Sequence, residues 1–393
     1  MKIAVCLPSL NEAANIASIT HIVDQGLSEI ILKYPYVNAE ILNFDSNSID
    51  QTPQIFQQTY THALKQSFIV TNGLGKGRNI LDFCEYVINN DIEYCLTIDS
   101  DIKSATPAWI VSLLTPLLSG YADYVTPVYK RSRFEGSSTN HFAVPFIFAI
   151  TGQLIRQPIA GDFGFTKKIA KVFLQNKLLF DPIIEHYGID IFMSISAINA
   201  NARIEQINLD KKIHAPSFHK LEYMFPQIAS TALLCKKQFN NPKSKIETTE
   251  SIEINILENL EFLHKDEANK MKKNALSILK ELKDYKWCSA NLIENYLQSS
   301  ALEIPSEVQM STLWIDILQE WIIYYQEVSD INSIQKAGNE LLPFFVLRAV
   351  NFWIWSESVS IVQIENAILE QAYQLRNILI NKLGLSLHLL DLQ

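Results

Sequence analysis

Two hydrophobic periodicities alternate along about the first 100 residues of the chain, and this alternation constrains the fold more than any other feature. Short apolar runs rich in β-branched and aromatic residues are typical of buried strands, whereas apolar residues that recur every three or four positions are typical of helices. We expect strands at residues 2–7, 39–44, 67–70 and 94–98, and helices at residues 11–32, 51–66 and 77–89. Strands and helices that take turns in this way predict an α/β domain with a mostly parallel sheet covered by helices.

The pattern changes near residue 226, after which helical periodicity continues with few interruptions. We expect helices at residues 252–284, 289–297, 310–326, 337–355 and 362–383. In the last of these, Ile364, Ile368, Leu375 and Leu379 keep helical spacing, so this helix is predicted to bury one face. A length of 393 residues is ample for two domains. We therefore predict an α/β domain at residues 1–225 and an all-helical C-terminal domain at residues 226–393.

The charge balance bears on the class of partner. The chain has 33 Lys and Arg residues against 42 Asp and Glu residues, which gives a net charge of −9. A nucleic-acid interface needs clustered Lys and Arg to neutralise backbone phosphates. The composition therefore argues against nucleic acid as a partner, while a small anionic ligand held by a few local groups remains compatible with it.

The cysteines and the apolar segments bear on the compartment. The cysteines are odd in number, lack metal-type spacing and lie mostly in apolar segments: Cys6, Cys84, Cys95, Cys235 and Cys288. Such residues are typical of reduced core thiols in a cytosolic protein. The apolar run before Pro8 is too short for a signal peptide, and residues 341–355 fall short of the roughly 20 residues that a membrane span needs. We expect a soluble, cytoplasmic protein with no transmembrane segment, and leave surface attachment to a membrane and homo-oligomerisation open.

Polar clusters follow three of the expected strands, at residues 8–12, 45–48 and 99–101. In an open parallel sheet the carboxyl ends of the strands share one edge, and ligands bind at that edge. Asp99 and Asp101 directly follow a buried strand and are therefore candidates for a ligand site. The alternative is an ordinary solvated turn before a helix that begins with Thr106 as its cap and Pro107 at its first position.

Further motifs carry residues with chemical potential, and each also has a structural explanation. Gly75-Lys76-Gly77 opens a helix, where backbone N–H groups and a lysine can meet a phosphate, although it lacks the spacing of a Walker loop. The segment 156–165 places two glycines and Asp162 in apolar surroundings, which fits either a ligand or a structural loop. Asp190 opens an apolar helix and His214 follows Lys212 by two positions; each alone also fits a solvated or structural role.

Taken in order, these motifs resemble the retaining nucleotide-sugar glycosyltransferases with a GT-A fold, a Rossmann-like α/β architecture. The mannosylglycerate synthase and glucosyl-3-phosphoglycerate synthase groups are the most similar. The matching motifs are Pro8 with Asn11-Glu12, Asp45-Ser46 with Ser48, Gly75-Lys76-Gly77, Asp99-Ser100-Asp101, Gln157-Pro158-Ile159-Ala160-Gly161, Tyr187-Gly188-Ile189-Asp190, and His214. The resemblance covers about residues 1–225 and, more weakly, the helical part, where residues 341–355 are similar to a helix of the mannosylglycerate synthase group.

The resemblance implies a nucleotide-sugar donor, GDP-mannose or UDP-glucose, and a divalent cation, Mn²⁺ or Mg²⁺, bound by Asp101 and His214. Such a cation neutralises the diphosphate as the glycosidic bond breaks, and imidazole among the ligands favours manganese. The donor would be bound by Pro8, Asn11, Glu12, Asp45, Ser46, Lys76, Asp99 and Ser100. Asp190, Asp99 and Lys76 would be catalytic: Asp99 holds the ribose or the sugar, Lys76 faces the diphosphate and Asp190 orients the sugar for front-face attack.

The same resemblance implies a small anionic acceptor such as glycerate. Its contacts would come from Arg131, Arg133, Thr139, Ile159, Ala160 and Gly161. Arginines suit a carboxylate because the guanidinium group can donate two parallel hydrogen bonds. The phosphoglycerate-binding version of this loop has the pattern Gly-Arg-x-Thr, whereas residues 136–139 read Gly-Ser-Ser-Thr here, which argues against 3-phosphoglycerate.

Two further hypotheses remain beside this one. The same donor chemistry could serve a protein or lipid acceptor docked on the helical domain. A non-catalytic nucleotide-sugar-binding protein is the other, and the presence of Lys76, Asp99, Asp101, Asp190 and His214 weighs against it.

Overall fold

The computed structural model describes residues 1–71, 73, 75–177, 183–213, 220–238, 256–257, 265–281 and 285–383. The chain forms two compact units. The first consists of Met1–Lys130 and Gln157–Thr231, and the second of Arg131–Arg156 and Ala232–Gln393. Residues 131–156, which the expected domain boundary places in the first domain, thus belong to the second unit.

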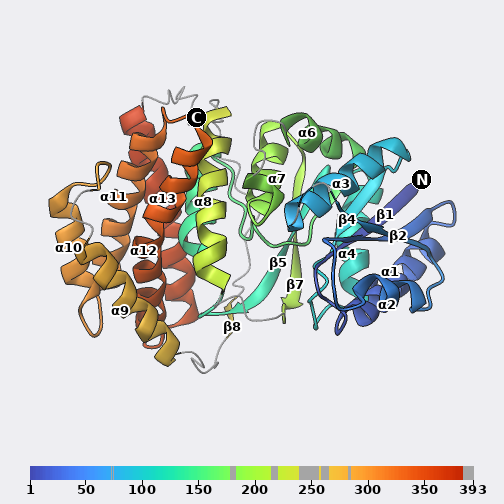
Figure 1. Ribbon diagram of the computed structural model, residues 1–393, viewed down its shortest axis with the longest axis horizontal. Helices are drawn as coiled ribbons and strands as arrows, with labels where there is room; N and C mark the ends of the chain where they lie inside the picture. Colours follow the sequence, from blue (N-terminus) through green and yellow to red (C-terminus); the bar gives the residue numbers. More distant parts are fainter. Residues whose placement is uncertain are drawn as a thin grey trace, which may run out of the picture. The chain divides into compact units, whose positions relative to one another are not determined.

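The first unit is built on a twisted sheet with the strand order β3-β2-β1-β4-β6-β5-β7 (Figure 1). The strands are β1 Lys2–Ser9, β2 Asn38–Asp45, β3 Leu64–Ile69, β4 Tyr94–Thr97, β5 Tyr124–Ser132, β6 Gly164–Thr166 and β7 Ile204–Lys211. Strands β3, β2, β1 and β4 are parallel, as are β5 and β7, while β6 runs antiparallel between β4 and β5. The mostly parallel sheet predicted from the alternating periodicities is confirmed.

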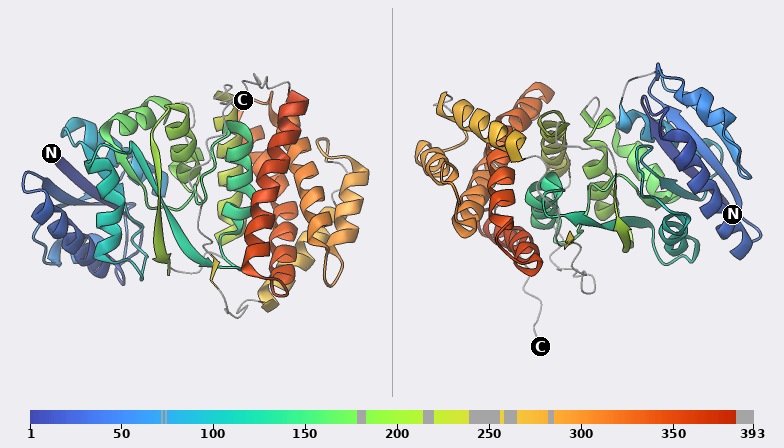
Figure 2. Two further views of the ribbon diagram at one scale, coloured as in Figure 1. Left: turned by 180° about the vertical axis from the view of Figure 1, so that it is seen from behind. Right: turned by 90° about the horizontal axis from the view of Figure 1, so that it is seen from below.

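Two layers of helices cover this sheet (Figures 1 and 2). The helices are α1 Ile16–Lys33, α2 Thr52–Gln58, α3 Lys76–Asn89, α4 Pro107–Leu118, α6 Lys167–Lys177 and α7 Ile189–Asn199. A further helix, α8 Leu221–Gln238, begins in the first unit and ends in the second. Helix α1 packs against α4, and α3 packs against α6 and α7 on the opposite side of the sheet. Central strand β1 is buried from Ile3 to Ser9 because both of its faces are covered, as is typical of a parallel sheet.

Two predicted helix boundaries of the first unit are wrong. Helix α1 begins at Ile16 and not near residue 11, because Asn11 has a positive φ of 58° and Glu12 O accepts bonds from the N–H groups of Asn15 and Ile16 in a separate turn. Helix α2 ends at Gln58 instead of residue 66. The following residues form edge strand β3, and Lys65 Nζ folds back to donate to Phe56 O at 2.8 Å.

The second unit is mainly helical. Its helices are α5 Val144–Thr151, α9 Lys265–Glu281, α10 Ala290–Ser300, α11 Glu307–Tyr325, α12 Ile331–Ser356 and α13 Ile361–Leu383, with a π-helix at Thr139–Ala143. Helix α13 packs along α5, and α12 packs against both α9 and α11. The predicted inward residues Ile364, Ile368, Leu375 and Leu379 are buried, as expected.

The predicted long helix at residues 252–284 is wrong in the part that the structure describes. Ile256–Leu257 form a short strand, β8, which pairs in parallel with Arg131 and Ser132 at the end of β5. Helix α9 spans Lys265–Glu281, within the predicted range. A two-residue strand is too short to leave a period in the sequence, so periodicity alone could not reveal it.

The interior of the second unit contains buried ion pairs as well as apolar side chains. Arg348 is fully buried and donates to Glu307 Oε2 at 2.7 Å, and Arg156 Nε donates to Glu365 Oε1 at 2.6 Å. His141 is also buried, with its ring centroid 4.3 Å from that of Phe352. Buried charges persist in proteins when each has a partner, as these have.

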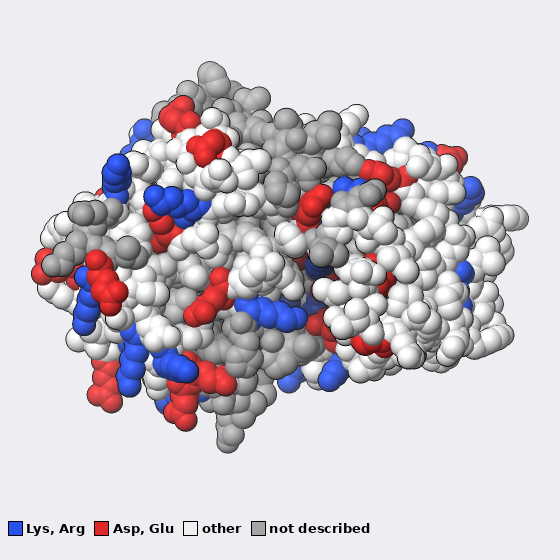
Figure 3. All heavy atoms as spheres, viewed as in Figure 1, with Lys and Arg blue, Asp and Glu red and all other residues white. Residues whose placement is uncertain are grey.

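The surface and the cysteines complete the description. On the face drawn in Figure 3, Lys and Arg side chains are interspersed with Asp and Glu. All five cysteines are free and buried, as predicted. Among the described residues, no helix combines the length and the apolar character that crossing a membrane requires.

Candidate active site

The three polar clusters predicted at strand ends meet at one edge of the sheet. The last residue of β1, Ser9, pairs with Asp45 at the end of β2, and Ser9 Oγ donates to Asp45 Oδ2 at 2.7 Å. Ser100, just after β4, donates through Oγ to Pro8 O at 2.8 Å. The parallel register of β1 with both neighbours therefore brings residues from three separate segments together, as the sequence predicted.

Asp45 and Ser46 are tied into this edge by internal hydrogen bonds. Asp45 is fully buried and accepts from the backbone N–H and the hydroxyl of Ser48, at 2.7 and 2.6 Å. Ser46 Oγ donates to Asn79 Oδ1 at 2.9 Å and accepts from Gly75 N at 3.3 Å. Both side chains thus hold the loop after β2 and the start of α3 in place. Their assignment to donor binding remains a prediction.

Asn11 and Glu12 form the neighbouring loop after β1. Asn11 donates from its backbone to Ser48 Oγ at 2.7 Å, and Glu12 donates from its backbone to Thr52 Oγ1 at 2.8 Å. Partial burial raises the pKa of Glu12. The hydrogen bond from Asn15 opposes this rise, and the nearby negative charge of Asp101 adds to it. Glu12 and Asp101 therefore share one electrostatic environment at the sheet edge.

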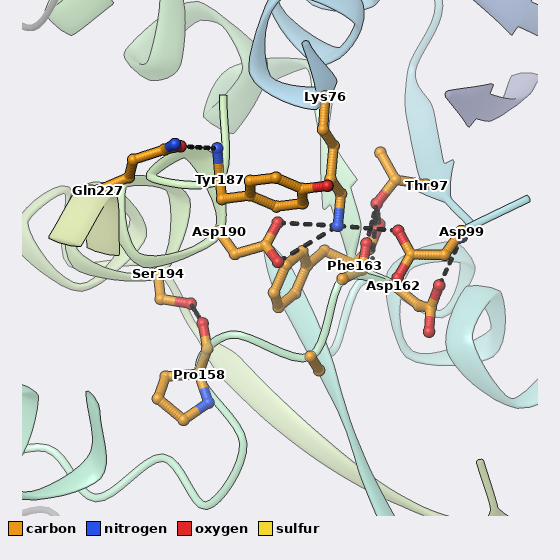
Figure 4. A network of polar contacts seen from close by, with 12 residues as sticks. Lys76, Thr97, Asp99, Pro158, Asp162, Phe163, Tyr187, Asp190, Ser194 and Gln227 are labelled. Atoms are coloured by element: carbon orange, nitrogen blue, oxygen red, sulfur yellow. Dashed lines mark hydrogen bonds and ion pairs between the residues drawn. The ribbon is translucent and has the colours of Figure 1, made fainter. Parts of the chain in front are cut away.

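Lys76, the first residue of α3, lies between two of the predicted catalytic carboxylates (Figure 4). Its Nζ is 2.8 Å from Asp99 Oδ1, and 3.2 Å from each carboxylate oxygen of Asp190 on α7. Lys76 thus directly contacts both of the other residues that the sequence assigned to catalysis, Asp99 and Asp190, the latter 114 positions beyond Lys76 along the chain.

These contacts set the charge states of the cluster. Burial alone would lower the pKa of Lys76, but the carboxylates of Asp190 and Asp99 raise it above its ordinary value. Burial opposes ionisation of Asp99, yet the ammonium groups of Lys76 and Lys212 hold the pKa of Asp99 below its ordinary value. For Asp190, burial dominates and raises the pKa. Lys76 is therefore a permanent cation at neutral pH.

Residues 184–186 pack directly against the N-terminus of α3. Gly75 has a φ of 121°, and Gly77 N donates to His186 O at 3.2 Å. A Cβ atom at Gly77 would lie 1.7 Å from Ile184 O, in the 3₁₀ helix Ile183–Glu185. Close packing at this position therefore requires a glycine. Of residues 75–77, Lys76 is the one whose side chain reaches Asp99 and Asp190.

Gly161 has a similar role beside Asp99. It adopts a φ of 92°, and a Cβ atom there would lie 2.1 Å from Asp99 Oδ2 and 3.0 Å from Lys76 Nζ. The adjacent Ala160 is buried, and its carbonyl accepts from Lys212 Nζ at 2.8 Å. Residues 160–161, predicted to contact the acceptor, therefore adjoin the carboxylate that is predicted to bind the donor, and Ile159, which was given the same role, directly precedes them.

Part of the chain matches a family of known proteins. Residues 4–177 match the family model described as Glycosyl transferase family 2. The predicted GT-A domain followed by a helical region is thereby confirmed as the fold class. No curated protein sequence matches the chain significantly.

Solved structures similar to this chain include glucosyl-3-phosphoglycerate synthase from Mycobacterium tuberculosis. The complex of that enzyme with Mn²⁺, UDP-glucose and phosphoglyceric acid is 24% identical over 60% of this chain and 79% of that chain, with a TM-score of 0.47. Its complex with Mn²⁺, UDP and glucosyl-3-phosphoglycerate is 23% identical over 64% and 84%, also with a TM-score of 0.47. A structure described as a mycobacterial protein is 22% identical over 64% and 79%, with the same TM-score.

The predicted acceptor residues Arg131, Arg133 and Thr139 belong to the second unit, and Arg131 lies within β5, next to its last residue Ser132. Arg133 Nη1 donates to Ser356 O and, at 3.1 Å, to Val359 O, carbonyls at the C-terminal end of α12. Thr139 is buried at the start of the π-helix. Gly136 has a φ of 70°, and a Cβ there would contact Arg131 Cδ at 3.6 Å. Acceptor binding by Arg131, Arg133 and Thr139 remains a prediction.

The predicted metal ligands are described in part. Asp101 is half-buried at the sheet edge, and His214 lies outside the described residues. Within the described part of the chain, no group of three or more His, Cys, Asp or Glu residues is arranged to hold a metal ion. A single carboxylate such as Asp101 is nevertheless compatible with Mg²⁺ or Mn²⁺, because such ions are commonly bound by one or two carboxylates together with substrate phosphates.

Two charged residues in the cluster had no role assigned from the sequence. Lys212 Nζ lies 2.7 Å from Asp162 Oδ2 and 3.1 Å from Asp99 Oδ2, and Asp162 also accepts from Tyr129 Oη. Asp162 Oδ1 accepts from Asp99 N at 2.7 Å. Both residues stood in segments that the sequence singled out, but the antiparallel insertion of β6 that places Asp162 beside Asp99 has no sequence signal of its own.

Proposed function

We propose that this protein is a metal-dependent retaining glycosyltransferase that moves a hexose from a nucleotide diphosphate sugar to a small hydroxy acid such as glycerate. The observation that carries the proposal is the position of Lys76, which bridges Asp99 and Asp190 at the edge where β1, β2 and β4 end in a glycosyl transferase family 2 domain. Ligands of open α/β sheets bind at this edge.

The charges of the cluster support a requirement for a cation. Lys76 and Lys212 face three carboxylates, those of Asp99, Asp162 and Asp190, and the two further carboxylates of Glu12 and Asp101 lie at the same edge. A diphosphate brought to this negative edge would be repelled unless a cation accompanied it. Asp101 and His214 would hold that ion, Mn²⁺ or Mg²⁺, which would supply charge neutralisation of the leaving diphosphate.

The side chains of the cluster have distinct tasks in this proposal. Lys76, with 18% of its side chain exposed, presents a fixed ammonium to the diphosphate. Asp99 would hold the ribose or the sugar, and Asp190 would orient the sugar by way of its fixed position against Lys76. No residue is required as a strong general base, because in front-face attack the departing phosphate oxygen can take the proton of the acceptor hydroxyl.

The experiment that tests the proposal measures donor binding first and transfer second. UDP-glucose and GDP-mannose are titrated calorimetrically with and without Mn²⁺, and at 100 times the dissociation constant a bound donor should stabilise the fold by about 2.7 kcal/mol. Transfer is then assayed with D-glycerate, 3-phosphoglycerate and lactate as acceptors. We expect metal-dependent binding of one donor and transfer to one hydroxy acid.

Each outcome separates the hypotheses. Donor binding without hydrolysis or transfer would support a non-catalytic nucleotide-sugar-binding protein. Metal-dependent donor hydrolysis with none of the three acids accepted would contradict the glycerate-type acceptor and favour a protein or lipid acceptor. A chain that binds neither donor would contradict the glycosyltransferase function itself.

A further inference from the structure

Lys212, which follows β7, is saturated by contacts within the protein. With 3% of its side chain exposed, its Nζ donates to Asp162 Oδ2 at 2.7 Å, Ala160 O at 2.8 Å and Asp99 Oδ2 at 3.1 Å. An ammonium group has three N–H donors, so these contacts use all of them. Lys212 therefore has no proton left to donate to a substrate phosphate, in contrast to the more exposed Lys76.

Lys212 and Asp162 together restrain the backbone and the side chain of Asp99. Asp162 is fully buried, accepts from Asp99 N through Oδ1 and binds Lys212 through Oδ2. Lys212 in turn holds Asp99 Oδ2, while Lys76 holds Asp99 Oδ1 at 2.8 Å. Both oxygens and the backbone N–H of Asp99 thus have set partners, and its side chain is confined to one orientation.

The third contact of Lys212 extends this restraint to the neighbouring turn. Its bond to Ala160 O anchors the residue before Gly161, whose backbone approaches Asp99 so closely that a Cβ atom would overlap Oδ2. The ring of Tyr129 lies 5.1 Å from Lys212 Nζ and packs on the same ammonium. The buried ammonium of Lys212 therefore links the Asp99 carboxylate to the Ala160–Gly161 turn that packs against it.

We propose that Lys212 is a positioning residue that holds the Asp99 carboxylate and the Ala160–Gly161 turn in a fixed relation to each other. Its effect on transfer rests on the proposed function, in which Asp99 binds the donor and the turn contacts the acceptor. Alignment of two reactants is sensitive to small shifts, since a misplacement of about 1 Å can cost on the order of 100-fold in rate.

The kinetic test compares Lys212→Met with Lys130→Met as the control. Lys130 is half-exposed and lies 3.8 Å from Asp210, so its loss removes an ion pair of the same unit away from Asp99. For Lys212→Met we expect kcat for transfer to fall by roughly 10- to 100-fold while Mn²⁺-dependent binding of UDP or GDP stays within about threefold of the parent. Unchanged kcat, or an equal loss of nucleotide binding, would overturn the positioning role.

A second measurement decides the inference without any substrate. Amide hydrogen exchange in residues 159–163 should become faster in Lys212→Met and stay unchanged in Lys130→Met. The double variant Lys212→Met/Asp162→Asn removes the unpaired buried carboxylate, so its unfolding midpoint should recover towards the parent while exchange in this segment remains fast. Parental exchange rates in the Lys212 variants would show that Lys212 fixes nothing; loss of all transfer in the parent would instead contradict the proposed function.

Discussion

Asp101 is the described side chain on which the proposed cation depends. Replacing it with Ala removes a charged ligand, a loss of about 1.5–3 kcal/mol, so Mn²⁺-dependent binding of UDP or GDP should weaken by roughly ten- to hundredfold. Isothermal calorimetry at fixed Mn²⁺ measures the change. Asp210→Ala is the control, because that carboxylate is 83% exposed and paired with Lys130 at 3.8 Å. Nucleotide affinity in Asp101→Ala equal to that of the control would contradict the metal assignment.

Gly161 and Gly120 form a matched pair for testing the close approach at Asp99. Both have positive φ angles, 92° and 70°, but a Cβ at Gly120 would meet no atom within 4 Å, whereas one at Gly161 would overlap Asp99 Oδ2. Each change to Ala should cost about 1–2 kcal/mol of backbone strain. Gly161→Ala should in addition lower transfer at least tenfold, since the methyl group must displace Asp99; chemical unfolding and transfer rates measure the two effects. Equal transfer rates in the two variants would show that the site tolerates the displacement.

At the scale of single residues, the sequence predicted the contacts that follow from strand ends and missed those that depend on register. Asp99 and Lys76 could be brought together because parallel strands deliver their carboxyl ends to one edge. The pairing of Asp162 with Asp99 arises from β6, a three-residue antiparallel strand between β4 and β5. Which strands become neighbours depends on long-range packing, and no local pattern around Asp162 encodes it.

At the scale of elements, Arg133 connects the loop after β5 to the end of α12, and this contact competes with its predicted role in acceptor binding. Its Nη1 donates to two carbonyls at the helix C-terminus, where a cation also interacts favourably with the helix dipole by about 0.3–1 kcal/mol. Arg133→Ala should therefore destabilise the fold by about 1–2 kcal/mol and leave the acceptor KM within about threefold. Urea unfolding and acceptor titration measure the two quantities.

Arg131→Ala tested in parallel completes this experiment. If Arg131 binds the acceptor carboxylate, its loss should raise the acceptor KM by roughly ten- to hundredfold and leave donor hydrolysis nearly unchanged. If Arg133→Ala raised the acceptor KM instead, Arg133 would be the residue that binds the acceptor.

Element boundaries were less predictable than element types. The helix expected at residues 51–66 stops at Gln58 because its last carbonyls are satisfied by Lys65, a residue of the next strand. Strand β3 reads Leu-Lys-Gln-Ser-Phe-Ile, too polar to be distinguished from a helix surface by period alone. Edge strands are half-solvated, which explains the weak apolar signal in this one.

At the scale of the whole molecule, His141 predicts how stability depends on pH. Burial and then the positive charge of Arg348 lower the pKa of this imidazole below its ordinary value of 6.5, so the folded state keeps it neutral. The unfolded chain takes up a proton below about pH 6.5, and this favours unfolding. The contribution of His141 is thus fully present above pH 6.5 and is lost as the pH falls, by up to about 1.4 kcal/mol per unit.

Unfolding by urea between pH 7.5 and 5 tests this expectation. The free energy of the parent should fall more steeply towards acid than that of His141→Gln, while the exposed control His62→Asn should keep the parental slope. Asp123 does not interfere, because the hydrogen bond from Arg203 lowers its pKa to about 2 and its contribution is lost only as the pH falls through that value. Parallel curves for the parent and His141→Gln would contradict the prediction.

The ion pairs around Lys76 also determine where crossover points can be placed in a chimeric protein. The segment that matches the glycosyltransferase family ends at residue 177 and contains Lys76, Asp99 and Asp162, but their partners Asp190 and Lys212 come later in the chain. Grafting residues 4–177 onto a related protein would keep the Lys76–Asp99 ion pair but would leave the buried Asp162 without Lys212 and Lys76 without Asp190. A chimera that preserves this chemistry needs its crossover point after residue 212.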